Sequence, residues 1–111
     1  MNYNIITTPE FDKRIKRLSK KYASIKEDFR NLLQSLQDNP VQGVLLKDGF
    51  RKIRMAITSK GKGKSGGARV ITLNCFLDES NKQIILVTIY DKNEQENITN
   101  AEISVALSTL L

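Results

Sequence analysis

The sequence predicts a small α+β protein in which an antiparallel, twisted sheet of about four strands packs against an N-terminal helix hairpin and a C-terminal helix. Two observations predict it. Apolar residues recur at helical spacing near both ends of the chain, and three strand-like runs lie between them. Helices and strands segregated in this way are typical of α+β folds. With 111 residues, 40% of them hydrophobic, the chain suits one domain over residues 1–111.

The N-terminal part of the chain predicts a short strand followed by a helix. Residues 2–7 are rich in β-branched side chains, which favour a strand. Thr8 and Pro9 then supply an N-cap and a proline at the first helical position. The helix is expected over residues 9–21, with an apolar face made by Phe11, Ile15, Leu18 and Tyr22.

A second helix follows after a short turn. Ser24 and Glu27 have the spacing of a capping box, which predicts the start of this helix. Asn39-Pro40 predicts its end, because proline cannot continue a helix. Its apolar face consists of Ile25, Phe29, Leu32, Leu33 and Leu36.

Three strands and a final helix complete the predicted fold. The strands are expected at residues 50–57, 68–77 and 82–90, and the last two form a hairpin. Thr99 and Glu102 form a second capping box, which begins a C-terminal helix. Ile98 and Ile103 are placed to form its hydrophobic staple.

The positive charge of the chain is concentrated in one segment. From Lys47 to Arg69 there are eight Lys and Arg residues and one acid, Asp48, so the segment carries +7 and the rest of the chain −1. Such a field attracts a polyanion. With a pI near 9.6, nucleic acid is the first partner to consider, ahead of an anionic membrane surface. We expect no membrane association, because no helix has the basic face and exposed aromatic residues of an interfacial helix.

The location predicted for the protein is the cytoplasm. The first residues lack the apolar stretch of a signal peptide, and no run is long enough to span a bilayer. The single cysteine, Cys75, sits in an apolar run, where it resembles a buried small hydrophobe and fits a reducing compartment.

Alternation within residues 50–57 predicts which side chains face solvent. Ile53, Met55 and Ile57 point one way, whereas Lys52 and Arg54 point the other way, onto a sheet face that we expect to be free of helices. Repulsion between the two cations favours the neutral amine of Lys52, which could then transfer a proton. The alternative is that both cations only keep an outer face soluble.

Arg69 is harder to place by the same rule. Alternation puts it in register with Ile71, Leu73 and Cys75, on a face that looks buried. A bulge or twist after Gly66-Gly67 would return it to the working face, and we favour that interpretation.

The loop before Arg69 alternates lysine with glycine. Lys62 and Lys64 lie between glycines whose backbone N–H groups could approach phosphate. The loop is not the phosphate loop of nucleotide hydrolases, because Thr58 replaces the required glycine and a strand follows instead of a helix. The alternative is a flexible, soluble connector.

Three motifs give the sequence a family resemblance. GFRKIRMA (residues 49–56), KGKGKSGGARVI (60–71) and VTIYDKNE (87–94), in this order of elements, resemble the RelE/ParE superfamily of type II toxin–antitoxin toxins. The RelE/HigB-type branch is the most similar, and the resemblance covers nearly the whole chain. It implies a RelE-like fold.

The resemblance also implies an activity and partners. Members of this branch are typically ribosome-dependent endonucleases that cleave mRNA, and a cognate antitoxin covers their catalytic face. The implied partners are therefore the antitoxin, the ribosome and mRNA, with operator DNA reached only indirectly through the antitoxin. No cofactor is implied.

The family pattern matches five positions as catalytic candidates, which are Lys52, Arg54, Arg69, Lys92 and Glu94. Since the 2′-OH of RNA is itself the nucleophile, cleavage needs a base, an acid and cations around the phosphate. We expect Lys52 to be the base, with Glu94 as its rival, and Arg54 and Arg69 to stabilise the transition state. Lys92 or a loop lysine would be the acid. The RNA-binding candidates are Lys47, Arg51, Lys60, Lys62, Lys64 and Tyr90.

The sequence departs from the family pattern in two ways. It has no histidine, so the acid/base sets of some relatives cannot operate. The tyrosine that others use for base stacking is absent, since that region reads ENITN, and Tyr90 is the available substitute. Two alternatives therefore stay open. One is a gyrase-inhibiting ParE-type toxin, and the other is an inactive homologue that only binds nucleic acid.

Overall fold

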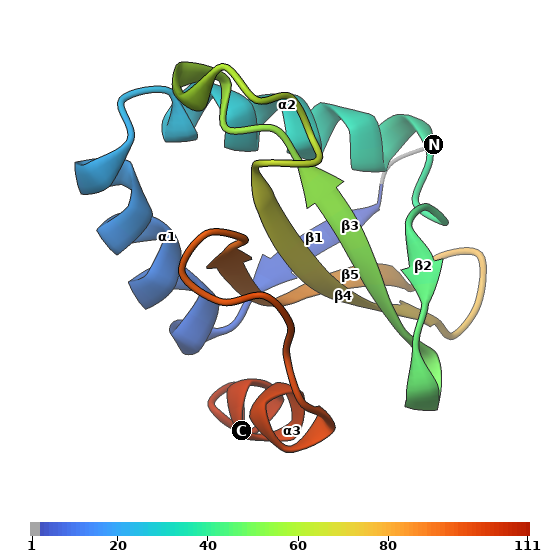
Figure 1. The fold of residues 1–111 in the computed structure, drawn as a ribbon. Helices are drawn as coiled ribbons and strands as arrows, with labels where there is room; N and C mark the ends of the chain where they lie inside the picture. Colours follow the sequence, from blue (N-terminus) through green and yellow to red (C-terminus); the bar gives the residue numbers. More distant parts are fainter. Residues whose placement is uncertain (1–2) are drawn as a thin grey trace.

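A five-stranded sheet forms the centre of the protein (Figure 1). The computed structural model describes residues 3–111. Its strands are β1 (Asn4–Thr7), β2 (Val44–Leu45), β3 (Phe50–Met55), β4 (Ala68–Phe76) and β5 (Lys82–Asp91), in the spatial order β1-β5-β4-β3-β2. β1 is parallel to β5, and all other neighbours are antiparallel. The α+β class is confirmed. The sequence did not predict β2, because two residues carry no periodicity.

Three α-helices surround the sheet, namely α1 (Pro9–Lys21), α2 (Ile25–Asp38) and α3 (Asn100–Ser108). The predicted N-cap of α1 is confirmed, since the Thr8 hydroxyl accepts a hydrogen bond from the Phe11 N–H at 3.0 Å. The capping box of Thr99 and Glu102 at α3 is also confirmed. Within residues 3–111 no helix is both long and apolar enough to cross a membrane.

The capping box predicted for α2 is wrong. Ser24 has a helical backbone conformation and its side chain makes no capping hydrogen bond. The Ser24 hydroxyl instead donates to the Asp28 carboxylate at 2.7 Å and accepts from the Ser59 backbone N–H at 2.9 Å. The side chain therefore connects the start of α2 to the loop after β3.

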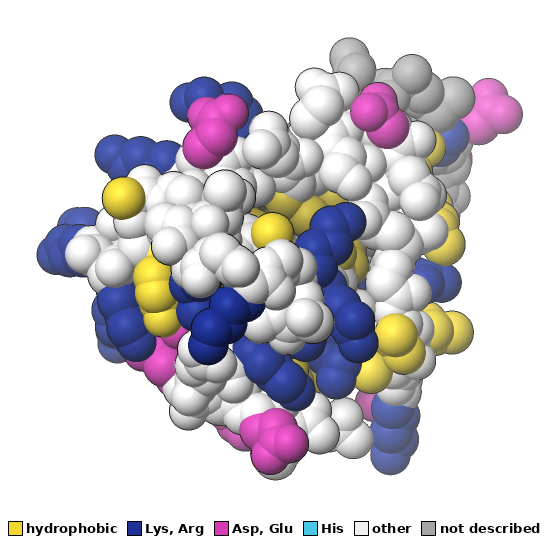
Figure 2. Space-filling model, turned by 45° about the horizontal axis from the view of Figure 1, so that its top comes forward, with side chains coloured by type: hydrophobic (Ala, Val, Ile, Leu, Met, Phe, Trp, Pro, Cys, Tyr) yellow, Lys and Arg dark blue, Asp and Glu magenta, His cyan; other side chains and the backbone are white. Residues whose placement is uncertain are grey.

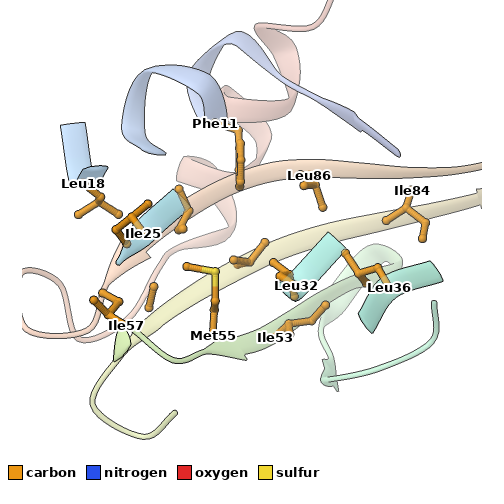
Figure 3. Close-up of a cluster of buried hydrophobic side chains, with 13 residues drawn as sticks. Phe11, Leu18, Ile25, Leu32, Leu36, Ile53, Met55, Ile57, Ile84 and Leu86 are labelled. Carbon is orange, nitrogen blue, oxygen red and sulfur yellow. The ribbon is translucent and has the colours of Figure 1, made fainter. Parts of the chain in front are cut away.

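One hydrophobic core lies between the sheet and the helices α1 and α2 (Figure 3). Ile53 and Met55 of β3 point into it, as their alternation with Lys52 and Arg54 predicted. The helices contribute Phe11, Leu18, Ile25, Leu32 and Leu36, and these side chains are fully or almost fully buried.

A second core lies between the opposite face of the sheet and α3, which stands apart from α1 and α2 in Figure 1. It contains Ile71, Val87 and Ile103, with Cys75 partly buried against it. The expectation of a helix-free sheet face is therefore wrong. Since α3 is a short helix, it covers only part of this face, and a further part remains for a site.

Candidate functional site: a cationic groove

A cavity of about 480 Å³ lies where β2, β3 and the start of β4 meet the segment after β5. We call it the cationic groove. Its lining contains five cations and no acid, and Figure 2 shows Lys and Arg side chains gathered in the middle of one face. The lining residues are Gln42, Gly43, Val44, Leu46, Lys52, Ile53, Arg54, Lys64, Arg69 and Lys92. The structure thus brings together four of the five catalytic candidates.

The strand register places three of these cations side by side. Arg54 of β3 lies directly opposite Arg69 of β4, and Lys52 lies opposite Ile71. Side chains of directly opposite residues share one face of a sheet. Lys52, Arg54 and Arg69 therefore face the same side, the side on which Ile71 packs towards α3. Like charges placed opposite each other destabilise a sheet, which is a cost that an anionic ligand would relieve.

The interpretation that a bulge turns Arg69 towards the working face is wrong. The register shift in β4 and β5 falls beyond Arg69, where Ile71 pairs with Thr88 and Thr72 pairs with Leu86. Simple alternation already puts Arg69 on the groove side. The buried face and the working face are the same face, apolar below α3 and cationic beyond it.

Arg69 is nearly buried, with 6% exposure, and its guanidinium is held by backbone carbonyls. Nη1 donates to the carbonyls of Lys64 at 3.1 Å and Ala68 at 3.2 Å, while Nη2 donates to Ser65 at 3.1 Å. These bonds leave its charge uncancelled, and they tie the end of the lysine loop to β4. Arg69 thus positions the loop as well as contributing charge.

Lys92 reaches the groove through a close backbone contact. Its N–H donates to the Gly67 carbonyl at 3.1 Å, and its ammonium donates to the Glu96 carbonyl at 2.9 Å. A Cβ at Gly67 would lie 2.2 Å from the Met55 carbonyl oxygen, so only glycine fits there. This glycine lets the end of β3, the start of β4 and the Lys92 segment meet.

Lys60 does not take part in the groove, contrary to its prediction as an RNA-binding residue. Its ammonium, 6% exposed, forms an ion pair at 2.8 Å with the fully buried Asp91. Asp91 also accepts from the Tyr22 hydroxyl at 2.6 Å and the Asn93 N–H at 3.0 Å. Burial alone would raise the pKa of Asp91, but the hydrogen bonds from Lys60, Tyr22 and Asn93 hold that pKa below its ordinary value.

Glu94 lies outside the lining of the groove as well. Its carboxylate accepts two hydrogen bonds from Arg17 of α1, at 3.0 and 2.7 Å, and one from Lys21 at 3.0 Å. The hydrogen bonds from Arg17 and then Lys21 lower the pKa of Glu94 to about 2. A carboxylate held in this way is a poor proton acceptor, so the geometry does not support its role as a base.

Tyr90 is 2% exposed, which rules out base stacking by this side chain in the conformation described. It lies opposite Arg69, and its hydroxyl has no hydrogen-bond partner among residues 3–111. Burial raises the pKa of Tyr90. Among the other RNA-binding candidates, Lys64 lines the groove, while Lys62 and Lys47 are exposed and Arg51 is half-buried outside it.

The sequence gave no signal for the wall that closes the groove on the other side. Gln42, Gly43 and Val44 precede or begin β2, which the sequence did not predict. Gly43 has φ +82°, and a Cβ there would lie 2.4 Å from the Lys52 carbonyl oxygen. The positive φ and this close approach explain the glycine, and it brings the wall against β3.

Comparison with known proteins places the fold. No protein-family model matches the sequence. The structure is similar to that of the E. coli toxin RelE in the free state, determined for a mutant with two arginines changed to alanine. The TM-score is 0.60, the sequence identity is 13%, and the match covers 100% of both chains. This chain has a RelE-like fold. At 13% identity the similarity establishes the fold alone, and it confirms the RelE-like architecture expected from the motifs.

Proposed function

We propose that this protein is the toxin of a type II toxin–antitoxin module, of the RelE/HigB-type branch, and that it cleaves mRNA on the ribosome. The observation that carries the proposal is the cationic groove, whose lining has five cations and no acid. RNA phosphates are the anions that best match such a surface. The RelE-like fold and the three sequence motifs support the same function.

The proposed reaction uses the 2′-OH of the RNA. Lys52, whose amine has no hydrogen-bond or ion-pair partner among the described residues, accepts the proton of the 2′-OH while O2′ bonds to phosphorus. The P–O5′ bond breaks, and Lys92 donates a proton to the leaving 5′ oxygen. The products are a cyclic 2′,3′-phosphate and a 5′-hydroxyl. Proton transfer of this kind contributes about 10²–10⁴ in rate.

The two arginines have a different role in this proposal. Arg54 and Arg69 face each other across β3 and β4, so both guanidinium groups can hold the phosphate oxygens as negative charge grows. Arg69 is already fixed by three carbonyl hydrogen bonds and needs little reorganisation. Exposed Lys62 and Lys64 would hold more distant phosphates.

The proposed partners follow from the same surface. A cognate antitoxin would cover the cationic groove with acidic side chains, and the ribosome would present mRNA to it. Contact with operator DNA would run through the antitoxin. We place the protein in the cytoplasm, where these partners are found.

The test is induction of the chain in a bacterial host without an antitoxin, followed by mapping of transcript ends. We expect growth arrest and new mRNA ends. Lys52→Ala combined with Arg69→Ala should abolish both, and Lys52→Ala alone should reduce them, which matters because Arg69 also holds the loop. The matched control is Lys13→Ala with Lys20→Ala, two exposed cations of α1 outside the groove.

Each contrary outcome has a distinct meaning. Growth arrest with intact transcripts would indicate a gyrase-directed toxin, and growth without arrest would indicate an inactive nucleic-acid-binding homologue. Full toxicity of the folded double variant would remove the catalytic assignment. Circular dichroism of each purified variant shows whether it is folded.

A further inference from the structure

A second cavity, of about 240 Å³, adjoins the cationic groove between α2 and β3. The two cavities share three lining residues, Gln42, Arg54 and Lys64. β2 pairs with β3 only at Arg51 and Lys52, so the rest of β3 has no strand neighbour on this side. The second cavity occupies the place that a longer β2 would fill.

The walls of this cavity differ from those of the groove. Its floor is apolar, because Leu32 and Met55 are 6% and 4% exposed and Ala56 lies beside them. Its rim is polar and uncharged, with Asn31 and Ser35 one turn apart on α2. The two cations stand only at the junction with the groove.

The one acid in the lining is already satisfied. Asp28 is 5% exposed, and its carboxylate accepts hydrogen bonds from the Ser24 hydroxyl at 2.7 Å and the Thr58 N–H at 3.0 Å. It fixes the loop after β3 and is not free to bind a cation. The Asn31 carboxamide, in contrast, is exposed and has no hydrogen-bond partner among residues 3–111.

We infer that this cavity binds one nucleobase of a single-stranded RNA whose phosphates lie in the cationic groove. An unstacked base needs an apolar surface for its ring and amide or hydroxyl groups for its edge, and the cavity offers both. Arg54 and Lys64 at the junction would contact the phosphate that links this nucleotide to the next. A phosphate would not be held by the uncharged inner rim. The inference rests on the proposed function and names a base-recognition subsite for it.

The direct test is RNA binding by the purified full chain. Fluorescence anisotropy compares a short single-stranded RNA with a series in which one nucleotide at a time is abasic. For the wild-type protein we expect one abasic position to weaken binding about tenfold, in the range known for single base contacts. Asn31→Leu, which fills the cavity and removes the amide, should bind the intact and the abasic RNA equally well.

Two further variants make the result decisive. Asn31→Ala removes the amide without adding bulk, and it should lose most of the discrimination if Asn31→Leu does not fold. Gln34→Leu is the matched control, since Gln34 is another exposed amide of α2 and does not line the cavity. In cells, the Asn31 variants should change the nucleotide preference beside the mapped cleavage position, and Gln34→Leu should not.

The outcomes separate this inference from the proposed function. If the wild-type chain discriminates against one abasic position but cleaves no transcript, the subsite stands and the proposed cleavage fails. If transcripts are cleaved, every abasic RNA binds equally and the Asn31 variants keep the wild-type preference, the subsite is overturned.

Discussion

Two clusters of cations lie close together in this protein, and they differ in one respect. In the cationic groove, Lys52, Arg54 and Arg69 have no acid within ion-pair distance among the described residues. Around Asp91 and Glu94, the cations Lys60, Arg17 and Lys21 are all paired with carboxylates. The second cluster joins α1, the loop after β3 and the segment after β5.

The difference shows that charge along the sequence does not by itself mark a binding surface. A paired cation in a buried cluster holds segments together, and its field is cancelled nearby. Unpaired cations on one face add their fields and attract a polyanion, although their mutual repulsion costs stability. Lys60, Lys62 and Lys64 alternate in one loop, yet the first belongs to the paired cluster and the other two remain exposed.

The largest effect is expected from breaking the buried pair. Lys60→Met leaves the Asp91 carboxylate buried without its cation, and removal of one partner from a buried pair costs about 3–5 kcal/mol. That is a large part of the total stability of a domain this size, about 5–15 kcal/mol. Urea unfolding measures the free energy of unfolding. The matched control is Lys62→Met in the same loop, for which we expect a change within about 0.5 kcal/mol.

A double-mutant cycle sharpens this comparison. Because Asp91→Asn removes the charge that Lys60→Met leaves unpaired, the double variant should lose less stability than the sum of the two single variants. Additive losses, or a Lys60→Met protein as stable as Lys62→Met, would show that the pair does not hold the loop.

A smaller effect, on binding, is expected from the exposed lysines of the same loop. Lys62→Gln with Lys64→Gln should leave the free energy of unfolding within about 1 kcal/mol, since neither side chain has an ion pair among the described residues. RNA affinity at low salt should fall. Each lost phosphate contact on a single strand lowers the slope of log K against log salt by about 0.7. Anisotropy titrations at several salt concentrations measure the slope, and an unchanged slope would contradict the assignment.

The sequence was sufficient for the elements that depend on local patterns. The N-caps at Thr8 and Thr99 and the alternation of Lys52 with Ile53 act within a few residues, so their structures follow from short segments. The capping box at Ser24 failed, because Asp28 and Ser59, one turn away and in a distant loop, compete for the same hydroxyl.

The pairing of charges could not be read in the same way. Lys60 and Asp91 are 31 residues apart, and Arg17 and Glu94 are 77 apart, so only the folded chain shows that they meet. The position of Arg69 was uncertain for a related reason. Alternation gave the right face, but the sequence did not show that one sheet face is apolar under α3 and cationic beyond it.

The smallest effect is expected from the exposed part of the paired cluster, at Glu94. The hydrogen bonds from Arg17 and Lys21 lower its pKa to about 2 in the folded protein, whereas an unfolded glutamate titrates near about 4.3. A group whose pKa is lowered by folding stabilises the protein above the unfolded pKa, and this contribution is lost as pH falls through the folded pKa. It is therefore complete above about pH 5 and gone near about pH 2.

Glu94→Gln tests both this linkage and the division between the two clusters. Since solvent screens the pair, the loss at neutral pH should stay below about 1 kcal/mol, and the variant should lose less stability than the wild type between about pH 5 and 2. Urea unfolding across this range measures it, with Glu96→Gln, an exposed acid with no ion pair among the described residues, as the control. Transcript cleavage should persist in Glu94→Gln. If cleavage were lost while the variant stayed folded, Glu94 would act in the chemistry after all, and paired cations would not be a sign of a purely structural cluster.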